Sequence, residues 1–309
     1  MRPALGLWWA WLAVLCQALP AMAAPPAKAA RGFDFAVVAQ PTRPGGQQLQ
    51  QALHASRNDA LAFLVLMGIK TAAEPCSDEL YEQRLDMLQQ QRRLVLLVPA
   101  AADWATCQRD DGSSNALERL SQLREQFFSV NTASTSTPPR LMHQSSVMQF
   151  RAFAENLRWE VDGVMFATLN LPANNNHYVA AAGRNSEFED RAVANRDWLQ
   201  RVSAAARKRR ARALVLFFDG DPRLWRGHPV RGEFDGYAAI RRQLREIAAR
   251  FPGKLLLVHH SRVAVDGRDQ RAGPQLSWRG NLGELIPGSG WTRVHYQPRA
   301  ATFTAARGD

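Results

Sequence analysis

Residues 61–67 read LAFLVLM and residues 94–98 read LVLLV, and the segment between them has the pattern of an amphipathic helix. A continuous apolar run of this length is typical of a strand that is buried on both faces. Ser77 is a suitable N-cap for a helix over residues 78–92, which has leucines near helical spacing. The stretch therefore predicts strands of a sheet that helices cover on both faces.

The same alternation extends in both directions along the chain. Asp162-Gly163 stands between two strand-like runs, residues 157–161 and 164–169, and this pair predicts a β-hairpin. The remaining predicted elements are strands over residues 33–39, 213–218, 254–259, 291–296 and 301–304, helices over residues 47–57, 115–128, 187–210 and 235–250, and polar loops over residues 130–146 and 170–185. Together these elements predict an α/β fold, in which two mixed β-sheets pack face to face between layers of helices.

The composition limits the class of protein. The chain has 309 residues, 46% of them apolar, with 39 Lys and Arg against 28 Asp and Glu. It is too apolar to be disordered, and its single long apolar stretch, at the N-terminus, excludes a multi-span membrane protein. The net charge of +11 permits anionic partners, but the sequence contains no nucleic-acid-binding motif.

The N-terminal segment resembles a secretory signal. Arg2 precedes an apolar core over residues 5–19, and Ala21-Met22-Ala23 has the small residues of a cleavage site. We therefore expect a signal peptide over residues 1–23, cut after Ala23, and a periplasmic or secreted protein with no transmembrane segment after cleavage. The alternative is an uncleaved N-terminal anchor. Residues 24–32 form a tether before one domain over residues 33–309.

Cleavage after Ala23 would leave Cys76 and Cys107 as the two cysteines of the mature chain. In an oxidising compartment an even pair favours a disulfide, which would tie two loops together. The alternative is a pair of buried free thiols.

Several local strings are spread over residues 33–304: Pro75-Cys76-Ser77-Asp78-Glu79-Leu80-Tyr81-Glu82, Trp104-x-x-Cys107-x-Arg109, Leu117-Glu118-Arg119-Leu120 with Phe127-Phe128, Glu155-Asn156-x-Arg158-Trp159, Phe166-Ala167-Thr168-Leu169-Asn170, Asn195-x-x-Trp198-Leu199 and Leu256-Leu257-Val258-His259. Together with the predicted layout, these strings resemble secreted members of the calcineurin-like metallophosphoesterase superfamily. The resemblance implies a four-layer αββα sandwich with a two-metal site on loops at the strand ends, where the metals would clamp a phosphoryl group.

The positions where the resemblance places the metal ligands are largely altered. Gln40 follows the first strand in place of an acidic residue, and Gly68 is followed by Ile69 and Lys70 in place of a bridging Asp. The donors that remain are Asp103, Asp219, Asp221, His259 and His260. Lys70 and Arg262 would place positive charge where a metal is expected, and would favour an anion.

The first hypothesis is therefore a pseudoenzyme, a phosphoesterase-type hydrolase fold that binds a phosphate-containing or other anionic ligand through Lys70 and Arg262. It needs no cofactor. The second hypothesis is an active phosphoesterase with a rearranged or mononuclear Mn, Fe or Zn site on Asp103, Asp219, His259 and His260. Because neighbouring residues of a strand point to opposite faces, a bend is needed for His259 and His260 to bind one ion.

The third hypothesis is a basic surface protein that binds anionic polymers. Arginines and a lysine close the predicted helix over residues 187–210, and more arginines follow on the next helix. The residues concerned are Arg207, Lys208, Arg209, Arg210, Arg212, Arg241, Arg242 and Arg245. A solvated helix end, favoured by the helix dipole, is the competing interpretation.

Overall fold

The computed structural model describes residues 32–128, 139–180, 185–225, 234–260 and 273–308. The predicted signal peptide, all of the tether except its last residue, and Arg262 lie outside these ranges. None of the described helices combines the length and the apolar character that a membrane span needs.

The first sheet has five strands in the order β12-β11-β1-β2-β3. Its strands are β1 (Phe33–Val38), β2 (Leu61–Met67), β3 (Val95–Val98), β11 (Trp291–Gln297) and β12 (Thr302–Arg307). β1, β2 and β3 run parallel, whereas β11 and β12 return antiparallel beside β1. The sheet is therefore mixed, and the apolar runs of the sequence form its parallel part.

The second sheet has seven strands in the order β4-β5-β6-β7-β8-β10-β9. Its strands are β4 (Met142–His143), β5 (Leu157–Val161), β6 (Val164–Thr168), β7 (Ala213–Phe217), β8 (Lys254–Val258), β9 (Gln275–Arg279) and β10 (Leu282–Ile286). β6, β7, β8 and β10 are parallel, and β5 and β6 form the predicted hairpin.

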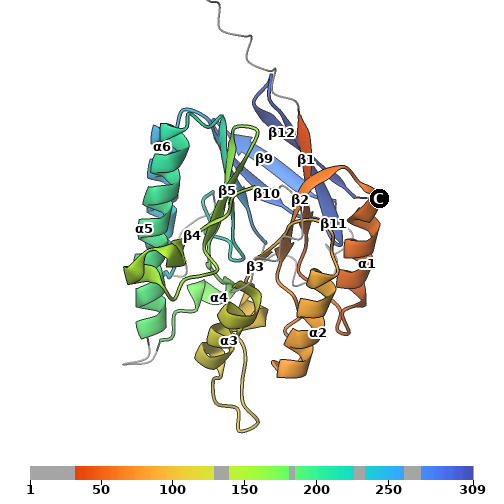
Figure 1. The fold of residues 1–309 in the computed structure, drawn as a ribbon. Coiled ribbons are helices and arrows are strands. Elements are labelled where there is room, and N and C mark those ends of the chain that lie inside the picture. Colours follow the sequence, from red (N-terminus) through yellow and green to blue (C-terminus); the bar gives the residue numbers. More distant parts are fainter. Residues whose placement is uncertain (1–31, 129–138, 181–184, 226–233, 261–272, 309) are drawn as a thin grey trace, which may run out of the picture.

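Helices cover the outer faces of both sheets (Figure 1). The helices are α1 (Gln47–Ala55), α2 (Asp78–Gln89), α3 (Ala116–Phe128), α4 (Ala173–Asn176), α5 (Ser186–Lys208) and α6 (Ala238–Arg250), with 3₁₀ turns η1 (Ser56–Asn58), η2 (Ala101–Asp103), η3 (Gln144–Ser146) and η4 (Met148–Phe150). α1 and α2 lie beside the first sheet, and α5 and α6 beside the second. The fold is thus α/β, with the predicted layers of helix, sheet, sheet and helix.

Two predicted loops contain short elements. Part of the segment over residues 130–146 lies outside the described ranges, and its described part contains β4 and η3. The segment over residues 170–185 contains α4, where Asn174, Asn175 and Asn176 all have positive φ angles. Polar composition conceals such elements, because asparagine tolerates the left-handed region that other residues avoid.

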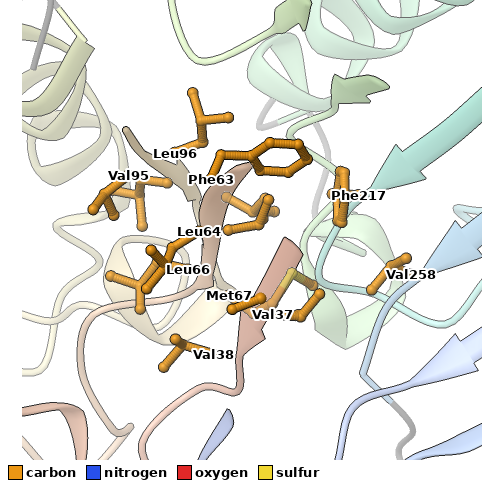
Figure 2. Close-up of a cluster of buried hydrophobic side chains, with 14 of the residues drawn as sticks. Val37, Val38, Phe63, Leu64, Leu66, Met67, Val95, Leu96, Phe217 and Val258 are labelled. Carbon is orange, nitrogen blue, oxygen red and sulfur yellow. The ribbon is translucent and has the colours of Figure 1, made fainter. Parts of the chain in front are cut away.

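Aromatic side chains fill the space between the sheets. Phe35 of β1 stacks on Phe63 of β2, with ring centroids 5.1 Å apart, and its edge meets Phe217 of β7 at 6.1 Å. Figure 2 shows Phe63 and Met67 on the side that faces Phe217 and Val258 of the second sheet. Large apolar side chains from both sheets thus share one core, which fixes how the two sheets face each other.

The predicted Cys76–Cys107 disulfide is present, with the two Cα atoms 5.8 Å apart. Cys76 lies immediately before α2, and Cys107 lies between η2 and α3. The bridge therefore joins two connections at the carboxyl edge of the first sheet.

Candidate functional site

The carboxyl ends of the parallel strands of both sheets meet at one edge of the sandwich. The Ala101 N–H donates to Asp219 Oδ2 over 2.7 Å, which joins the connection after β3 to the one after β7. The Gln40 N–H donates to His260 Nε2 over 3.3 Å, which joins the ends of β1 and β8. We call Gln40, Lys70, Asp103, Asp219 and His260 the strand-end cluster. It lies where the resemblance places a phosphoesterase centre.

Asp103 is fully buried in this cluster and is occupied by backbone donors. Its Oδ1 accepts from the N–H groups of Ile69 and Lys70 over 3.0 and 3.3 Å, and its Oδ2 accepts from Ala100 over 2.8 Å. Burial raises the pKa of Asp103 to about 7, although the hydrogen bonds from Ala100 and Ile69 and the charge of Lys70 act in the opposite direction. The carboxyl group therefore fastens the loops after β2 and β3 to each other.

Asp219 and His260 form a second closed set of hydrogen bonds. Asp219 Oδ2 accepts from the N–H groups of Ala101 and Ala173, and Asp219 Oδ1 lies 3.1 Å from His260 Nδ1. Because His260 Nε2 accepts the Gln40 N–H, the ring proton is on Nδ1 and donates to Asp219. Both nitrogens of His260 are thus used within the protein.

Lys70 is buried rather than presented at a surface. Its Nζ donates to the Thr71 carbonyl over 2.9 Å, and burial lowers the pKa of the amine even though Asp103 and Glu74 lie nearby. Arg262, the other predicted anion-binding residue, lies outside the described residues. Lys70 therefore does not present its amine at the surface, and the anion site expected from Lys70 and Arg262 stays a prediction.

The strand-end cluster does not fit a two-metal centre. Such a centre needs several Asp, Asn and His donors with free lone pairs directed at the ions. Here both oxygens of Asp103 accept backbone N–H groups. One oxygen of Asp219 accepts a backbone N–H and the other bonds to His260, while the Gln40 side-chain amide donates to the Lys70 carbonyl. Asp103 and Asp219, two of the carboxylates in the expected ligand set, instead hold loops together.

Asp221 and His259 belong to a different group, on the outer face of the second sheet. His259 stacks on Phe218, with ring centroids 5.4 Å apart, and Phe218 belongs to the core under α5 and α6. Asp221, His259 and Glu284 each contribute one atom that can bind a metal, and these three atoms lie within 4.8 Å of one another. The five predicted donors are therefore divided between two places, and His259 and His260 point to opposite faces as predicted.

The sequence analysis missed Glu284, which is the middle residue of β10. Its neighbours Leu282 and Leu285 are buried, and Glu284 pairs in register with Leu257 of β8. A lone acidic residue in an apolar strand was the available signal. Its proximity to His259 depends on the pairing of β10 with β8, which no local pattern reveals.

The analysis also missed a buried polar network at α4. Arg191 of α5 is fully buried, and it donates to the side-chain and main-chain oxygens of Asn176 and to both oxygens of Glu187. Glu187 also lies 3.2 Å from His177 Nδ1. Burial alone would raise the pKa of Glu187, but the hydrogen bond from His177 and the charge of Arg191 lower it to about 2. The network holds the left-handed turn of α4.

A groove of about 350 Å³ runs between α5 and α6, and Asn176 of α4 contributes to its lining. Its charged lining consists of four arginines, Arg196, Arg207, Arg242 and Arg250, and one acidic residue, Glu246. All four arginines are exposed, and among the described residues none of their side chains forms an ion pair or a hydrogen bond that would neutralise them. We call this site the arginine groove.

The basic patch expected from the sequence is distributed differently. Arg241 is buried, bonded to the Pro222 carbonyl and paired with Asp235, while Arg245 donates to the Leu224 carbonyl. Of the residues expected in the patch, only Arg207 and Arg242 line the groove. Sequence spacing could not distinguish guanidinium groups that fasten a loop from those that face solvent.

Comparison with known proteins adds little to this geometry. No family model and no curated protein matches the chain. A solved structure of no stated function covers 90% of this chain and 100% of its own, with 10% sequence identity and a TM-score of 0.44. This similarity is too weak to carry an inference, so the functional argument rests on the residues described above.

Proposed function

We propose that this protein is a catalytically impaired, phosphoesterase-like protein that acts by binding an anionic, phosphate-bearing ligand. The observation that carries the proposal is the arginine groove. Four guanidinium groups gather along one groove without acidic partners among the described residues, apart from the nearby Glu246. A row of positive charges with so little acidic compensation makes the electrostatic potential along the groove positive, and a bound polyanion would neutralise it.

The groove favours an extended ligand over a single phosphate. Arg196 and Arg207 are three helical turns apart on α5, roughly 16 Å along the helix axis. Arg242 and Arg250 follow the facing edge of α6. Guanidinium groups bind phosphate oxygens in a bidentate manner, so a chain that carries several phosphates can contact both rows at once.

The strand-end cluster supports the non-catalytic part of the proposal. Asp103 and Asp219 hold loops, and both nitrogens of His260 are used. The alternative of a mononuclear phosphoesterase on Asp103, Asp219, His259 and His260 would need His259 to leave the outer face of the sheet. It would also need the two carboxylates to exchange backbone donors for a metal.

The proposal is tested by binding of linear polyphosphate and of orthophosphate to the purified chain, measured by titration calorimetry at two salt concentrations. The groove variant replaces Arg196, Arg207, Arg242 and Arg250 with Gln. The control replaces four other exposed arginines that have no side-chain partner among the described residues, Arg43, Arg57, Arg92 and Arg299, with Gln. It removes the same charge.

We expect the groove variant to lose at least about tenfold in polyphosphate affinity, or about 1.4 kcal/mol, and the control to retain most of its affinity. Binding should weaken with salt and should not require a metal. Equal losses in both variants would reject the groove. Hydrolysis of phosphomonoesters or phosphodiesters that a chelator abolishes would favour the alternative enzyme.

A further inference from the structure

Asp221, His259 and Glu284 come from three separate segments and converge on the outer face of the second sheet. Asp221 follows β7, His259 follows β8, and Glu284 lies in β10. His259 Nε2 is 3.5 Å from Glu284 Oε1, and all three donor atoms lie within 4.8 Å of one another. Ligand atoms around a tetrahedral zinc ion are about 3.4 Å apart, so small side-chain rotations would suffice to enclose an ion.

The orientation of His259 leaves one ring nitrogen, Nε2, available to a ligand. His259 Nδ1 lies 2.8 Å from the His260 carbonyl oxygen, which can only accept, so Nδ1 carries a proton and donates. In the neutral ring this leaves the lone pair on Nε2, directed at the carboxylates. The His259 side chain is 2% exposed, and Nε2 has no well-formed hydrogen bond among the described residues. A backbone carbonyl that fixes the ring in this way is a common partner of metal-binding histidines.

The two carboxylates are available to a cation. Asp221 Oδ1 accepts the Arg223 N–H over 2.7 Å, which positions the carboxylate, and no described residue hydrogen-bonds to its other oxygen. Within the described chain neither Asp221 nor Glu284 forms an ion pair with Lys or Arg. Both side chains are partly exposed, so an ion and a water ligand can reach the site.

We propose that Asp221, His259 and Glu284 bind one first-row divalent metal ion of the zinc type, separate from the strand-end cluster. One imidazole and two carboxylates are a donor set that Zn²⁺ accepts, and three protein ligands leave a position for water. The site is independent of the arginine groove, because the two share no residue.

A proton on His259 Nε2 would compete with a metal ion for the same position. Burial opposes a charge on His259, but the carboxylate of Glu284, 3.5 Å from Nε2, the hydrogen bond to the His260 carbonyl and the charge of Asp221 outweigh it and raise the pKa of the imidazole. A protonated His259 would then pair with the carboxylates without a metal. Because a metal must displace this proton, the two occupants differ in their response to added Zn²⁺.

The test uses the full chain, purified without chelator and dialysed against Zn²⁺, with bound metal measured by mass spectrometry. The variants are Asp221→Asn and Glu284→Gln, which keep the shape of each side chain, and the control is Glu82→Gln, an exposed acidic residue on α2. His259 is left unchanged because it is packed in the core. Co²⁺ is used as a second probe, because its visible spectrum reports direct coordination.

We expect about one equivalent of Zn²⁺ in the wild type and in Glu82→Gln, and at least about a tenfold weaker affinity in Asp221→Asn and Glu284→Gln. The Co²⁺ spectrum should change in the same two variants. Absence of binding in the wild type, or binding that Asp221→Asn and Glu284→Gln leave unchanged, would overturn the proposal. Polyphosphate binding is measured separately in metal-free buffer, so failure of the groove and failure of the metal site are distinguishable.

Discussion

His259 and His260 are neighbours in the chain, yet they have different chemical environments. His260 faces the junction of the two sheets, where both its nitrogens are occupied by Gln40 and Asp219. His259 faces the outer layer, where it stacks on Phe218 and directs Nε2 toward Glu284. The alternation of side chains along a strand is enough to separate a fastening role from a ligand-binding role within two residues.

At the same scale, Glu187 determines how the turn of α4 responds to acid. Its folded pKa of about 2 lies below the ordinary glutamate value of 4.5, so ionised Glu187 stabilises the fold above pH 4.5. This contribution is lost as the pH falls from about 4.5 toward about 2. We expect Glu187→Gln to reduce the free energy of unfolding at pH 7 by roughly 3 kcal/mol at most and to flatten this part of the acid response.

Urea unfolding at several pH values, followed by circular dichroism, measures this effect. Glu189 is an exposed glutamate on the same helix, so Glu189→Gln is the matched control and should behave as the wild type. A Glu187→Gln protein with an unchanged pH profile would show that the contacts of Glu187 with His177 and Arg191 contribute no stability.

The sequence indicated several of the residues that gather at the strand ends, but not the contacts that they make there. The prediction that His259 and His260 point to opposite faces of the sheet was correct, because the alternation of side chains depends only on local backbone geometry. Lys70 was expected to bind an anion, but its amine is buried, bonded to the Thr71 carbonyl and close to Asp103. Glu284 was missed because its role depends on a strand pairing with β8 that is distant in sequence.

At the scale of elements, the hairpin of β5 and β6 begins the antiparallel edge of the second sheet. Asp162 and Gly163 have φ angles of 45° and 78°, as a two-residue turn between twisted strands requires. The apolar runs and this turn allowed most strands to be predicted. The order of strands was not predictable, because β10 and β11 return from the end of the chain to join different sheets.

Gly163 allows the energetic cost of this turn to be measured by itself. A Cβ at Gly163 would meet no atom within 4 Å, so Gly163→Ala adds only the strain of a positive φ. We expect a loss of about 1 kcal/mol in the free energy of unfolding. Gly273 has equally open surroundings without a positive φ, so Gly273→Ala should be neutral or slightly stabilising in the same urea titration. Equal effects in the two variants would contradict the argument.

At the scale of the whole molecule, the two sheets are joined at their faces and at one edge. The faces share the aromatic core of Phe35, Phe63 and Phe217, and the edge is joined by the hydrogen bond from Ala101 to Asp219. The Cys76–Cys107 bridge lies at the same edge. The Tyr81 hydroxyl lies beside Cys107 and donates to the Asp103 carbonyl, which connects the bridge to the strand-end cluster. The strand-end cluster thus acts as a structural joint between the sheets.

Removing the bridge tests how much of the stability depends on this edge. The disulfide closes a loop with a sequence separation of 31 residues, and we expect the double variant Cys76→Ala/Cys107→Ala to lose about 3 to 4 kcal/mol in the free energy of unfolding. Urea unfolding under oxidising conditions measures the loss. In the presence of a reducing agent the wild type should approach the variant, because both then lack the cross-link. If the two proteins unfold alike under oxidising conditions, the bridge contributes nothing, and hydrogen bonds alone hold the edge between the sheets.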